Sequence, residues 1–174
     1  MRIYLVGYMG CGKTTLGKRL ASRLGFQFVD TDLMFEEKYH MSIVNFFSFF
    51  GEIMFRDLEK EILRSTSQFE NTVVSTGGGT PVLPGNMEFI RKNGISCYLK
   101  MPPAALLSRL TSSKKKRPLI KEMNRDTLLH MIEKHLTERE SRYLMADYSV
   151  EGLSLQLDEL TKLIKADPRF APTL

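Results

Sequence analysis

The sequence has only two cysteines, Cys11 and Cys97, which are too few for a disulfide framework and fit a reducing, cytoplasmic compartment. It also lacks an apolar run near the roughly 20 residues that a membrane span needs, so we expect no membrane partner. An apolar stretch and a glycine motif follow Met1 directly, and we therefore expect no signal peptide. No repeat, low-complexity segment or linker interrupts the 174 residues. The sequence therefore predicts one domain, 1–174.

Acidic and aromatic residues are scarce in segment 100–125, which carries eight basic residues, one acid and no aromatic side chain. The run Lys-Lys-Lys-Arg at 114–117 is of a kind that can bind nucleic acid. Without an aromatic residue to stack on a base, we predict no nucleic-acid partner. We expect instead a lid, over about 111–122, in which Arg117 reaches nucleotide phosphates.

A glycine-rich motif at 7–14, Gly-Tyr-Met-Gly-Cys-Gly-Lys-Thr, fits the phosphate-binding P-loop. An apolar run at 3–6 precedes it and leucines at helical spacing follow it, which predicts strand, loop and helix. Backbone N–H groups and the helix N-terminus would hold phosphates, Lys13 would reach the β- and γ-phosphates of ATP, and Thr14 would ligate Mg²⁺. The predicted ATP-binding residues of the loop are Gly10, Cys11, Gly12, Lys13, Thr14 and Thr15.

Apolar runs alternate with helical patterns along the chain, which predicts an α/β fold with a parallel sheet covered on both faces. The expected strands are Arg2–Val6, Phe26–Val29, Thr72–Ser75, Ile95–Leu99 and Tyr148–Val150. Helices are expected to begin near Lys13, Leu33, Ser42, Glu52, Gly85, Pro103, Arg125 and Ser154. Two prolines after Ala166 predict a frayed C-terminal tail.

Two aspartates, Asp30 and Asp32, follow the second predicted strand. At i and i+2 of an extended chain they would point to one side, and ligands of parallel sheets gather at the carboxyl ends of the strands. One carboxylate could order the water shell of a metal, and the other could hold or deprotonate an acceptor hydroxyl. The alternative is that Asp32 caps the helix predicted at 33–38.

The third predicted strand, 72–76, lacks the aspartate that normally ends a Walker-B strand and runs into Gly77, Gly78 and Gly79. This absence favours Asp30 as the residue that supports magnesium. The triple glycine exposes consecutive backbone N–H groups and lets a ligand approach closely, with a plain flexible turn as the alternative.

Arg56 and Glu59 lie at i and i+3, on one face of a predicted helix. An arginine there can bind a substrate carboxylate while the acid holds it in place, or the two can form a surface salt bridge. Arg139 could likewise face the site or pair with a nearby acid. The phenylalanines just before the Arg56 helix are expected in the core: Phe46, Phe47, Phe49 and Phe50.

Together these motifs resemble the shikimate kinase family from residue 3 to about residue 164. The P-loop is shared by a vast superfamily, whereas the combination is specific. In the family's order it reads Asp30-Thr31-Asp32, Ser42-Ile43, Gly51-Glu52, Phe55-Arg56-x-x-Glu59, Gly77-Gly78-Gly79, Arg117-Pro118-Leu119 and Arg139-x-x-x-Tyr143.

The resemblance implies a P-loop kinase of three-layer α/β/α architecture, with a five-stranded parallel sheet, a mobile lid and a substrate-binding helical region at about 33–62. We expect a monomer. It implies MgATP-dependent phosphorylation of the shikimate 3-hydroxyl, on the way to chorismate and the aromatic amino acids. Two alternatives stay open: a related small-molecule kinase, such as a gluconate kinase, and a nucleotide-binding switch that has no acceptor.

The resemblance also implies roles for individual residues. Asp32 would hold the shikimate hydroxyls and serve as base, or only orient the hydroxyl. Asp30 would support Mg²⁺ with Thr14. Lys13, Asp32 and Arg117 are thus the predicted catalytic residues, and the acceptor would be bound by Asp32, Arg56, Gly77, Gly78, Gly79 and Arg139.

The sequence departs from the family pattern at a few positions. Cys11 stands where the family often has serine or alanine, which should leave the backbone cradle intact. Arg109 is the expected ATP-side arginine, but it precedes Leu110 and Thr111, whereas the family often has arginine directly before threonine. The segment 153–156, which should border adenine, carries no strong motif.

Overall fold

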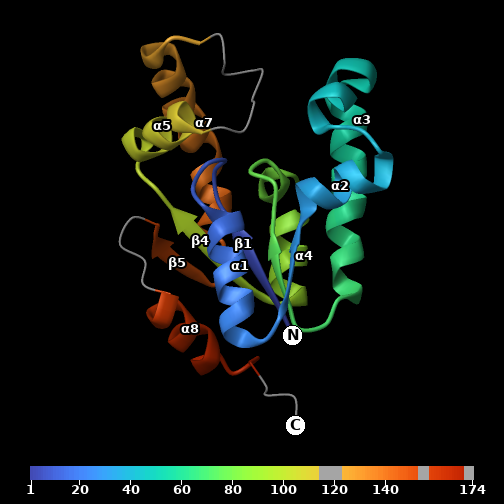
Figure 1. The fold of residues 1–174 in the computed structure, drawn as a ribbon, viewed down its shortest axis with the longest axis vertical. Coiled ribbons are helices and arrows are strands. Elements are labelled where there is room, and N and C mark those ends of the chain that lie inside the picture. Colours follow the sequence, from blue (N-terminus) through green and yellow to red (C-terminus); the bar gives the residue numbers. More distant parts are fainter. Residues whose placement is uncertain (114–122, 153–156, 171–174) are drawn as a thin grey trace.

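A computed structural model of the protein describes residues 1–113, 123–152 and 157–170. Its five parallel strands form one sheet in the order β2-β3-β1-β4-β5 (Figure 1). The strands are β1 (Arg2–Val6), β2 (Gln27–Asp30), β3 (Thr72–Ser75), β4 (Ile95–Lys100) and β5 (Tyr148–Glu151). All five predicted strands are confirmed, within one residue at each end.

Helices cover both faces of the sheet, as predicted (Figure 1). In chain order the helices are α1 (Lys13–Leu24), α2 (Thr31–Tyr39), α3 (Ile43–Ser65), α4 (Asn86–Asn93), α5 (Pro103–Ser112), α7 (Arg125–Tyr143) and α8 (Leu157–Ala166). Two short 3-10 helices, η1 (Thr66–Gln68) and η2 (Thr80–Val82), flank β3. The three-layer α/β/α architecture is confirmed.

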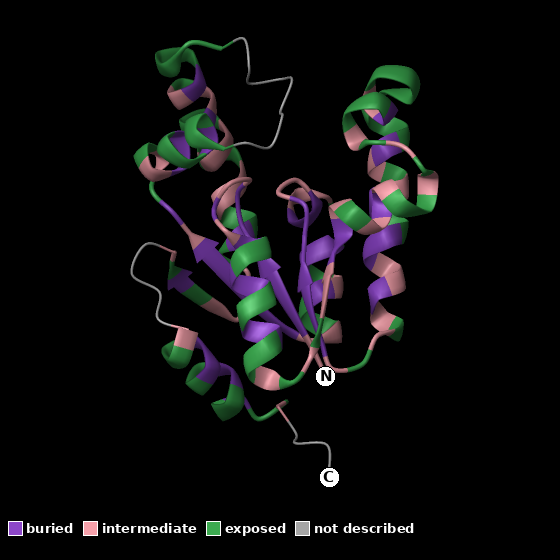
Figure 2. Ribbon diagram, viewed as in Figure 1, coloured by how far each residue is buried: buried purple, intermediate pink, exposed green. Residues whose placement is uncertain are grey.

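Alternate residues of β1 belong to two different cores. Ile3 and Leu5 pack with side chains of α1, α5, α7 and α8, whereas Tyr4 and Val6 pack with α3, α4 and the end of α7. Both sets are fully buried (Figure 2). A central strand buried on both faces explains why this stretch of sequence is continuously apolar.

Two predicted helix starts, near Ser42 and Glu52, fall in one helical segment, α3. The segment is kinked at Gly51, whose φ of 79° and ψ of 171° lie outside the helical region. A residue with these angles interrupts the helical hydrogen bonds, and glycine adopts them at the least cost. The start predicted near Ser154 lies outside the described residues, which resume at Leu157.

The core prediction for the four phenylalanines is correct only in part. Phe46 is buried against Phe35 of α2 and Phe55 of α3, in a small cluster of its own. Phe49 and Phe50 are 74% and 51% exposed, so their placement in the core was wrong. The physical reason is that the described part of this cluster is formed by α2, α3 and the turn between them, and Phe49 and Phe50 do not belong to it.

Residues 167–170 are held by defined contacts, so the frayed tail predicted after Ala166 was wrong for them, while 171–174 lie outside the described residues. Asp167 Oδ1 accepts hydrogen bonds from Arg169 N and Nε, both at 2.9 Å, and Oδ2 accepts from Arg169 Nη2 and from the Tyr148 hydroxyl. The Phe170 ring stacks on Phe26 with centroids 6.0 Å apart. These contacts hold 167–170 in place despite Pro168.

We expect Asp167→Asn to lower the free energy of unfolding by about 2 kcal/mol at neutral pH, because hydrogen bonds to a charged group contribute roughly 1.5–3 kcal/mol. The hydrogen bonds from Arg169 lower the pKa of Asp167 in the folded protein below its ordinary value. The stabilisation is therefore present above the unfolded pKa, about 3.9, and is lost as the pH falls further. Urea unfolding of the parent protein and of Asp167→Asn at several pH values measures the difference between their free energies of unfolding. A difference that does not become smaller in acid contradicts this account.

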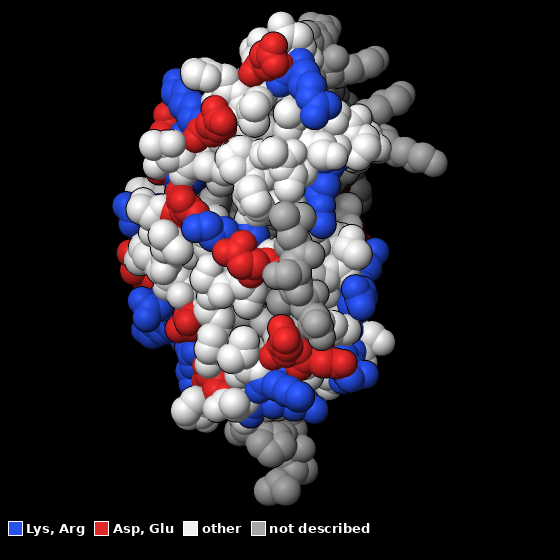
Figure 3. All heavy atoms as spheres, turned by 90° about the vertical axis from the view of Figure 1, so that its left-hand side faces the viewer, with Lys and Arg blue, Asp and Glu red and all other residues white. Residues whose placement is uncertain are grey.

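No helix within the described residues is long and apolar enough to cross a membrane. On the face drawn in Figure 3, basic and acidic side chains alternate over the described surface. The basic run 114–117, on which the nucleic-acid alternative depended, lies outside the described residues.

Candidate active site

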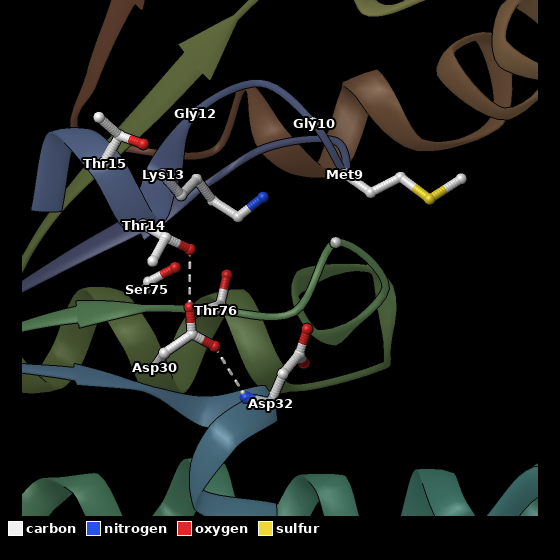
Figure 4. A pocket seen from close by; sticks show the side chains of 11 residues that line it. Met9, Gly10, Gly12, Lys13, Thr14, Thr15, Asp30, Asp32, Ser75 and Thr76 are labelled. Atoms are coloured by element: carbon white, nitrogen blue, oxygen red, sulfur yellow. Dashed lines mark hydrogen bonds between the residues drawn. The ribbon is translucent and has the colours of Figure 1, made fainter. Parts of the chain in front are cut away.

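A cavity of about 200 Å³ opens at the carboxyl ends of β1, β2 and β3. It lies between the P-loop on one side and the loop after β3 on the other (Figure 4). Its lining residues are Met9, Gly10, Gly12, Lys13, Thr14, Thr15, Asp30, Asp32, Ser75, Thr76 and Gly78. This is where the topology of a parallel sheet places ligands, and it gathers most of the predicted site residues.

The P-loop turns sharply into α1 at Gly12, the N-cap residue, whose φ is 101°. A side chain there would be strained, and its Cβ would lie 2.9 Å from Arg109 Nη1. Arg109 comes from α5 and donates to the Cys11 carbonyl at 3.1 Å. The structure therefore places Arg109 against the P-loop.

Lys13 is buried, and its ammonium lies beneath the P-loop (Figure 4). Nζ donates to the carbonyl oxygens of Gly7 at 2.8 Å and Tyr8 at 2.9 Å, and lies 3.7 Å from Cys11 Sγ. These contacts hold the positive charge at the cavity wall, where a nucleotide's phosphates would provide stronger, charged acceptors.

Asp30 ends β2 and forms two hydrogen bonds that organise the cavity floor (Figure 4). Oδ2 accepts from the Thr14 hydroxyl at 2.8 Å, and Oδ1 accepts from the backbone N–H of Asp32 at 3.1 Å, which caps α2. The cap of this helix is thus Asp30, and the proposed alternative of capping by Asp32 was wrong. The helix begins at Thr31, two residues earlier than predicted, because the Asp30 side chain accepts the hydrogen bond of the Asp32 N–H in its first turn.

The extended geometry predicted for the aspartate pair was wrong, since Asp32 is the second residue of a helix. The two side chains nevertheless line the same cavity, because the strand ends where α2 starts. Asp32 points toward the loop after β3 (Figure 4), where a Cβ built on Gly77 would lie 2.6 Å from its Oδ1.

The Thr14 hydroxyl and the Asp30 carboxylate fit a Mg²⁺ ion that is shared with a nucleotide. Both are hard oxygen donors, they lie 2.8 Å apart, and they line the cavity beside Lys13. Mg²⁺ usually keeps several waters and takes one or two protein ligands plus phosphate oxygens. Within the described residues, no three acidic, histidine or cysteine side chains are grouped so that they could hold a metal ion.

Each residue of the triple glycine approaches a different part of the site. A Cβ on Gly77 would collide with Asp32, one on Gly78 would lie 3.0 Å from the Met9 backbone nitrogen, and one on Gly79 would lie 2.7 Å from Arg56 Nη1. The loop is also fixed, because Gly77 N–H donates to the Thr31 hydroxyl at 3.0 Å. The glycines thus allow the P-loop, α2 and α3 to converge, so a plain flexible turn does not describe this loop.

Arg56 lies over Gly79 and is held by two acids of its own helix. Nη1 donates to Glu59 Oε2 at 2.8 Å, while Nε and Nη2 donate to Glu52 Oε1. Glu59 is buried, so this pair is not the surface salt bridge that the sequence left open. Burial opposes the charge of Arg56, but the adjacent Glu59 and Glu52 raise the pKa of Arg56 above its ordinary value.

Helix α7 contributes a row of residues whose combined placement the sequence analysis missed. His135, Arg139 and Tyr143 are spaced by four residues and so lie on one helix face. His135 Nδ1 is hydrogen-bonded to the Tyr8 hydroxyl at 2.8 Å, and the Arg139 guanidinium lies 5.9 Å from the centre of the Tyr8 ring. Arg139 is thus placed beside the P-loop. The i, i+4, i+8 spacing was the sequence signal that could have revealed this.

Tyr143, at the end of this row, ties α7 to the triple glycine. Its hydroxyl donates to the Gly78 carbonyl at 2.6 Å. Burial raises the pKa of Tyr143 well above its ordinary value, so the hydroxyl stays a donor at neutral pH. Burial and the charge of Arg139 lower the pKa of His135, which favours a neutral imidazole at the P-loop.

Two predictions fall where the structure makes no statement. Arg117 and nearly all of the lid predicted at 111–122 lie outside the described residues, as does the adenine-side segment 153–156.

A P-loop that faces carboxylates and a glycine loop across one cavity, with Arg56 packed against that glycine loop, defines the class of P-loop kinases. A family model described as shikimate kinase matches residues 9–166. The chain belongs to the shikimate kinase family.

Individual relatives agree with this assignment. The shikimate kinase of Bacteroides fragilis is 43% identical over 148 residues, which is 85% of this chain and 83% of that protein. The crystal structure of the shikimate kinase from Bacteroides thetaiotaomicron has a TM-score of 0.89 at 37% identity and covers 95% of this chain and 96% of that one. The Acinetobacter baumannii enzyme, solved in complex with shikimate, has a TM-score of 0.79 at 36% identity and covers 94% and 89%.

Proposed function

We propose that this protein transfers the γ-phosphoryl group of ATP to the 3-hydroxyl of shikimate, giving ADP and shikimate 3-phosphate for chorismate and aromatic amino acid synthesis. The observation that carries this proposal is that the P-loop, Asp32 and Gly78 line one cavity, while Arg56 packs against the next residue of the glycine loop, Gly79. The shikimate bound to the Acinetobacter baumannii relative supports the choice of acceptor.

On the ATP side, the P-loop N–H groups and the N-terminus of α1 would bind the phosphates. Lys13 would leave the Gly7 and Tyr8 carbonyls to contact the β- and γ-phosphates, and Arg109 and Arg117 would add positive charge. Thr14 and Asp30 would hold the Mg²⁺ ion, which supplies charge neutralisation on the phosphate oxygens when bound.

On the acceptor side, Asp32 would hold the hydroxyl that attacks phosphorus and accept its proton as the new bond forms. Phosphoryl transfer depends mainly on positioning and electrostatics, so orienting this hydroxyl is the larger part of the role. Arg56 and Arg139 would bind the carboxylate. Backbone N–H groups of Gly78 and Gly79 would contact the acceptor, and Gly77, whose own N–H is bonded to Thr31, would let it approach Asp32 closely.

The two alternative functions receive less support. A gluconate kinase would also need an anionic acceptor site, but the family assignment selects shikimate. A nucleotide switch would not need an acceptor pocket beside Asp32.

We further propose a monomer, because every group named in the site comes from one chain. We also propose a cytoplasmic location, where the free thiols Cys11 and Cys97 are stable.

A coupled ADP-release assay with a panel of hydroxy acids tests this function. With MgATP we expect turnover with shikimate and little with gluconate, and two-dimensional ¹H–³¹P NMR should place the new phosphate on the 3-hydroxyl of shikimate. Omitting the acceptor is the control for ATP hydrolysis. Turnover with gluconate and none with shikimate, or ATP hydrolysis that does not depend on any acceptor, would contradict the proposal.

A further inference from the structure

A buried threonine hydroxyl contacts the carboxylate that holds Arg56. Thr80, the first residue of η2, follows the triple glycine and is completely buried. Its Oγ1 donates to Glu59 Oε1 at 2.6 Å, while Glu59 Oε2 accepts from Arg56 Nη1 at 2.8 Å. The two oxygens of one carboxylate thus have separate partners, one on the glycine-loop side and one on α3.

The hydroxyl of Thr80 is itself held in place by the backbone around it. Thr80 N–H donates to the Gly77 carbonyl at 3.2 Å, and the Thr80 carbonyl accepts from Asn86 Nδ2 at 2.8 Å. Asn86 is also completely buried. A β-branched residue with a fixed backbone has few side-chain rotamers, so its hydroxyl is a rigid donor.

This rigid donor sets the orientation of Glu59. With Oε1 fixed by Thr80, the plane of the carboxylate is defined, and Oε2 faces Arg56. Without the hydroxyl, Oε1 would be a buried charged oxygen that lacks this donor, and the carboxylate would rotate or recruit water to satisfy it. The other acid on Arg56, Glu52, has a largely exposed side chain and cannot fix the guanidinium as firmly.

We propose that Thr80 is a positioning residue for acceptor binding, which acts through Glu59 on Arg56. The inference rests on the proposed function, in which Arg56 binds the carboxylate of shikimate. Since Arg56 Nη1 would lie 2.7 Å from a Cβ on Gly79, the glycine loop and the arginine form one packed unit. Thr80 links the two parts of this unit by its hydroxyl.

Thr80→Val removes the hydroxyl and keeps the branched shape. We expect the KM for shikimate to rise about tenfold, as for the loss of one hydrogen bond to a charged group, with kcat and the KM for ATP changed less than about twofold. Thr80→Ser, which keeps the hydroxyl, should restore the parental KM. In an Arg56→Ala background, Thr80→Val should have no further effect on KM, because its action passes through Arg56.

Thr66→Val is the matched control. Thr66 is equally buried, and its hydroxyl bonds the Leu63 carbonyl and the Tyr4 hydroxyl, away from the cavity. This variant should lose stability and keep the parental KM for shikimate. If Thr80→Val fails to fold, Thr80→Ala replaces it, because the smaller side chain removes the hydroxyl without crowding Glu59.

A parental KM for shikimate in Thr80→Val, or the same rise in KM when Arg56 is alanine, would overturn the inference. Failure of the proposed function is a separate result, seen when the parent protein does not phosphorylate shikimate. In that case crystal structures of the parent and Thr80→Val still decide whether Thr80 orients Glu59 and Arg56. A Glu59 carboxylate and an Arg56 guanidinium in parental positions in Thr80→Val would overturn the inference, and a rotated carboxylate would support it.

Discussion

Lys13→Met is expected to lower kcat/KM by about 10²–10³, the usual effect of removing one preorganised group that stabilises developing charge. Methionine has nearly the length of lysine and fills the same buried position without the ammonium. The loss should appear mainly in kcat, because the charge on the transferring phosphoryl group is greatest in the transition state. Steady-state kinetics with varied ATP and shikimate measure the effect.

Arg19→Ala is the control for Lys13→Met, because Arg19 is an exposed cation of the same helix, α1. It should leave kcat/KM unchanged. Since Lys13 also donates to the Gly7 and Tyr8 carbonyls, circular dichroism and thermal unfolding must show that Lys13→Met is folded. A folded Lys13→Met protein with parental kcat/KM would mean that the P-loop does not bind the reacting phosphates.

Asp32→Asn is expected to lower kcat by about 10²–10⁴, the range for a positioned group that accepts a proton in the transition state. Asparagine keeps the size of the side chain and can still orient a hydroxyl, but it cannot take the proton. The KM for ATP should change little, because the pair of Thr14 and Asp30, which would hold the magnesium ion, is intact. Single-turnover kinetics, which isolate the phosphoryl-transfer step from product release, provide the measurement.

The control is Glu37→Gln, which removes one negative charge from an exposed position of the same helix, α2. It should have parental kcat and KM. If Asp32→Asn keeps kcat and only raises the KM for shikimate, then Asp32 binds the acceptor without taking part in proton transfer. If both constants stay parental, Asp32 is not part of the acceptor site.

The sheet was predictable from the sequence because β1, β3 and β4 are buried on both faces and consist mainly of apolar and β-branched residues. The P-loop was predictable because its glycines and Lys13 have fixed spacing within the eight-residue motif 7–14. The start of α2 was missed because it depends on a side-chain cap by Asp30 that helix periodicity does not reveal. The ordered tail was missed because the contacts of Asp167 with Arg169 and Tyr148 offset the helix-breaking prolines.

The acceptor side of the site was only partly predictable. The i, i+3 spacing of Arg56 and Glu59 placed them together, but whether the pair is buried depends on α2, the glycine loop and η2. The contact of Thr80 with Glu59 joins residues 21 positions apart, and the contact of Tyr8 with His135 joins residues 127 positions apart. Neither pair shares a local motif, so only the three-dimensional structure brings them together.

A crystal structure of the protein with ADP, Mg²⁺ and shikimate tests the central claim most directly. The account predicts that Lys13 Nζ leaves the Gly7 and Tyr8 carbonyls for the β-phosphate, and that the shikimate carboxylate contacts Arg56. The shikimate 3-hydroxyl should lie against Asp32 and point toward the phosphate side of the cavity. Shikimate bound away from Arg56, or with its 3-hydroxyl directed away from the P-loop, would contradict it.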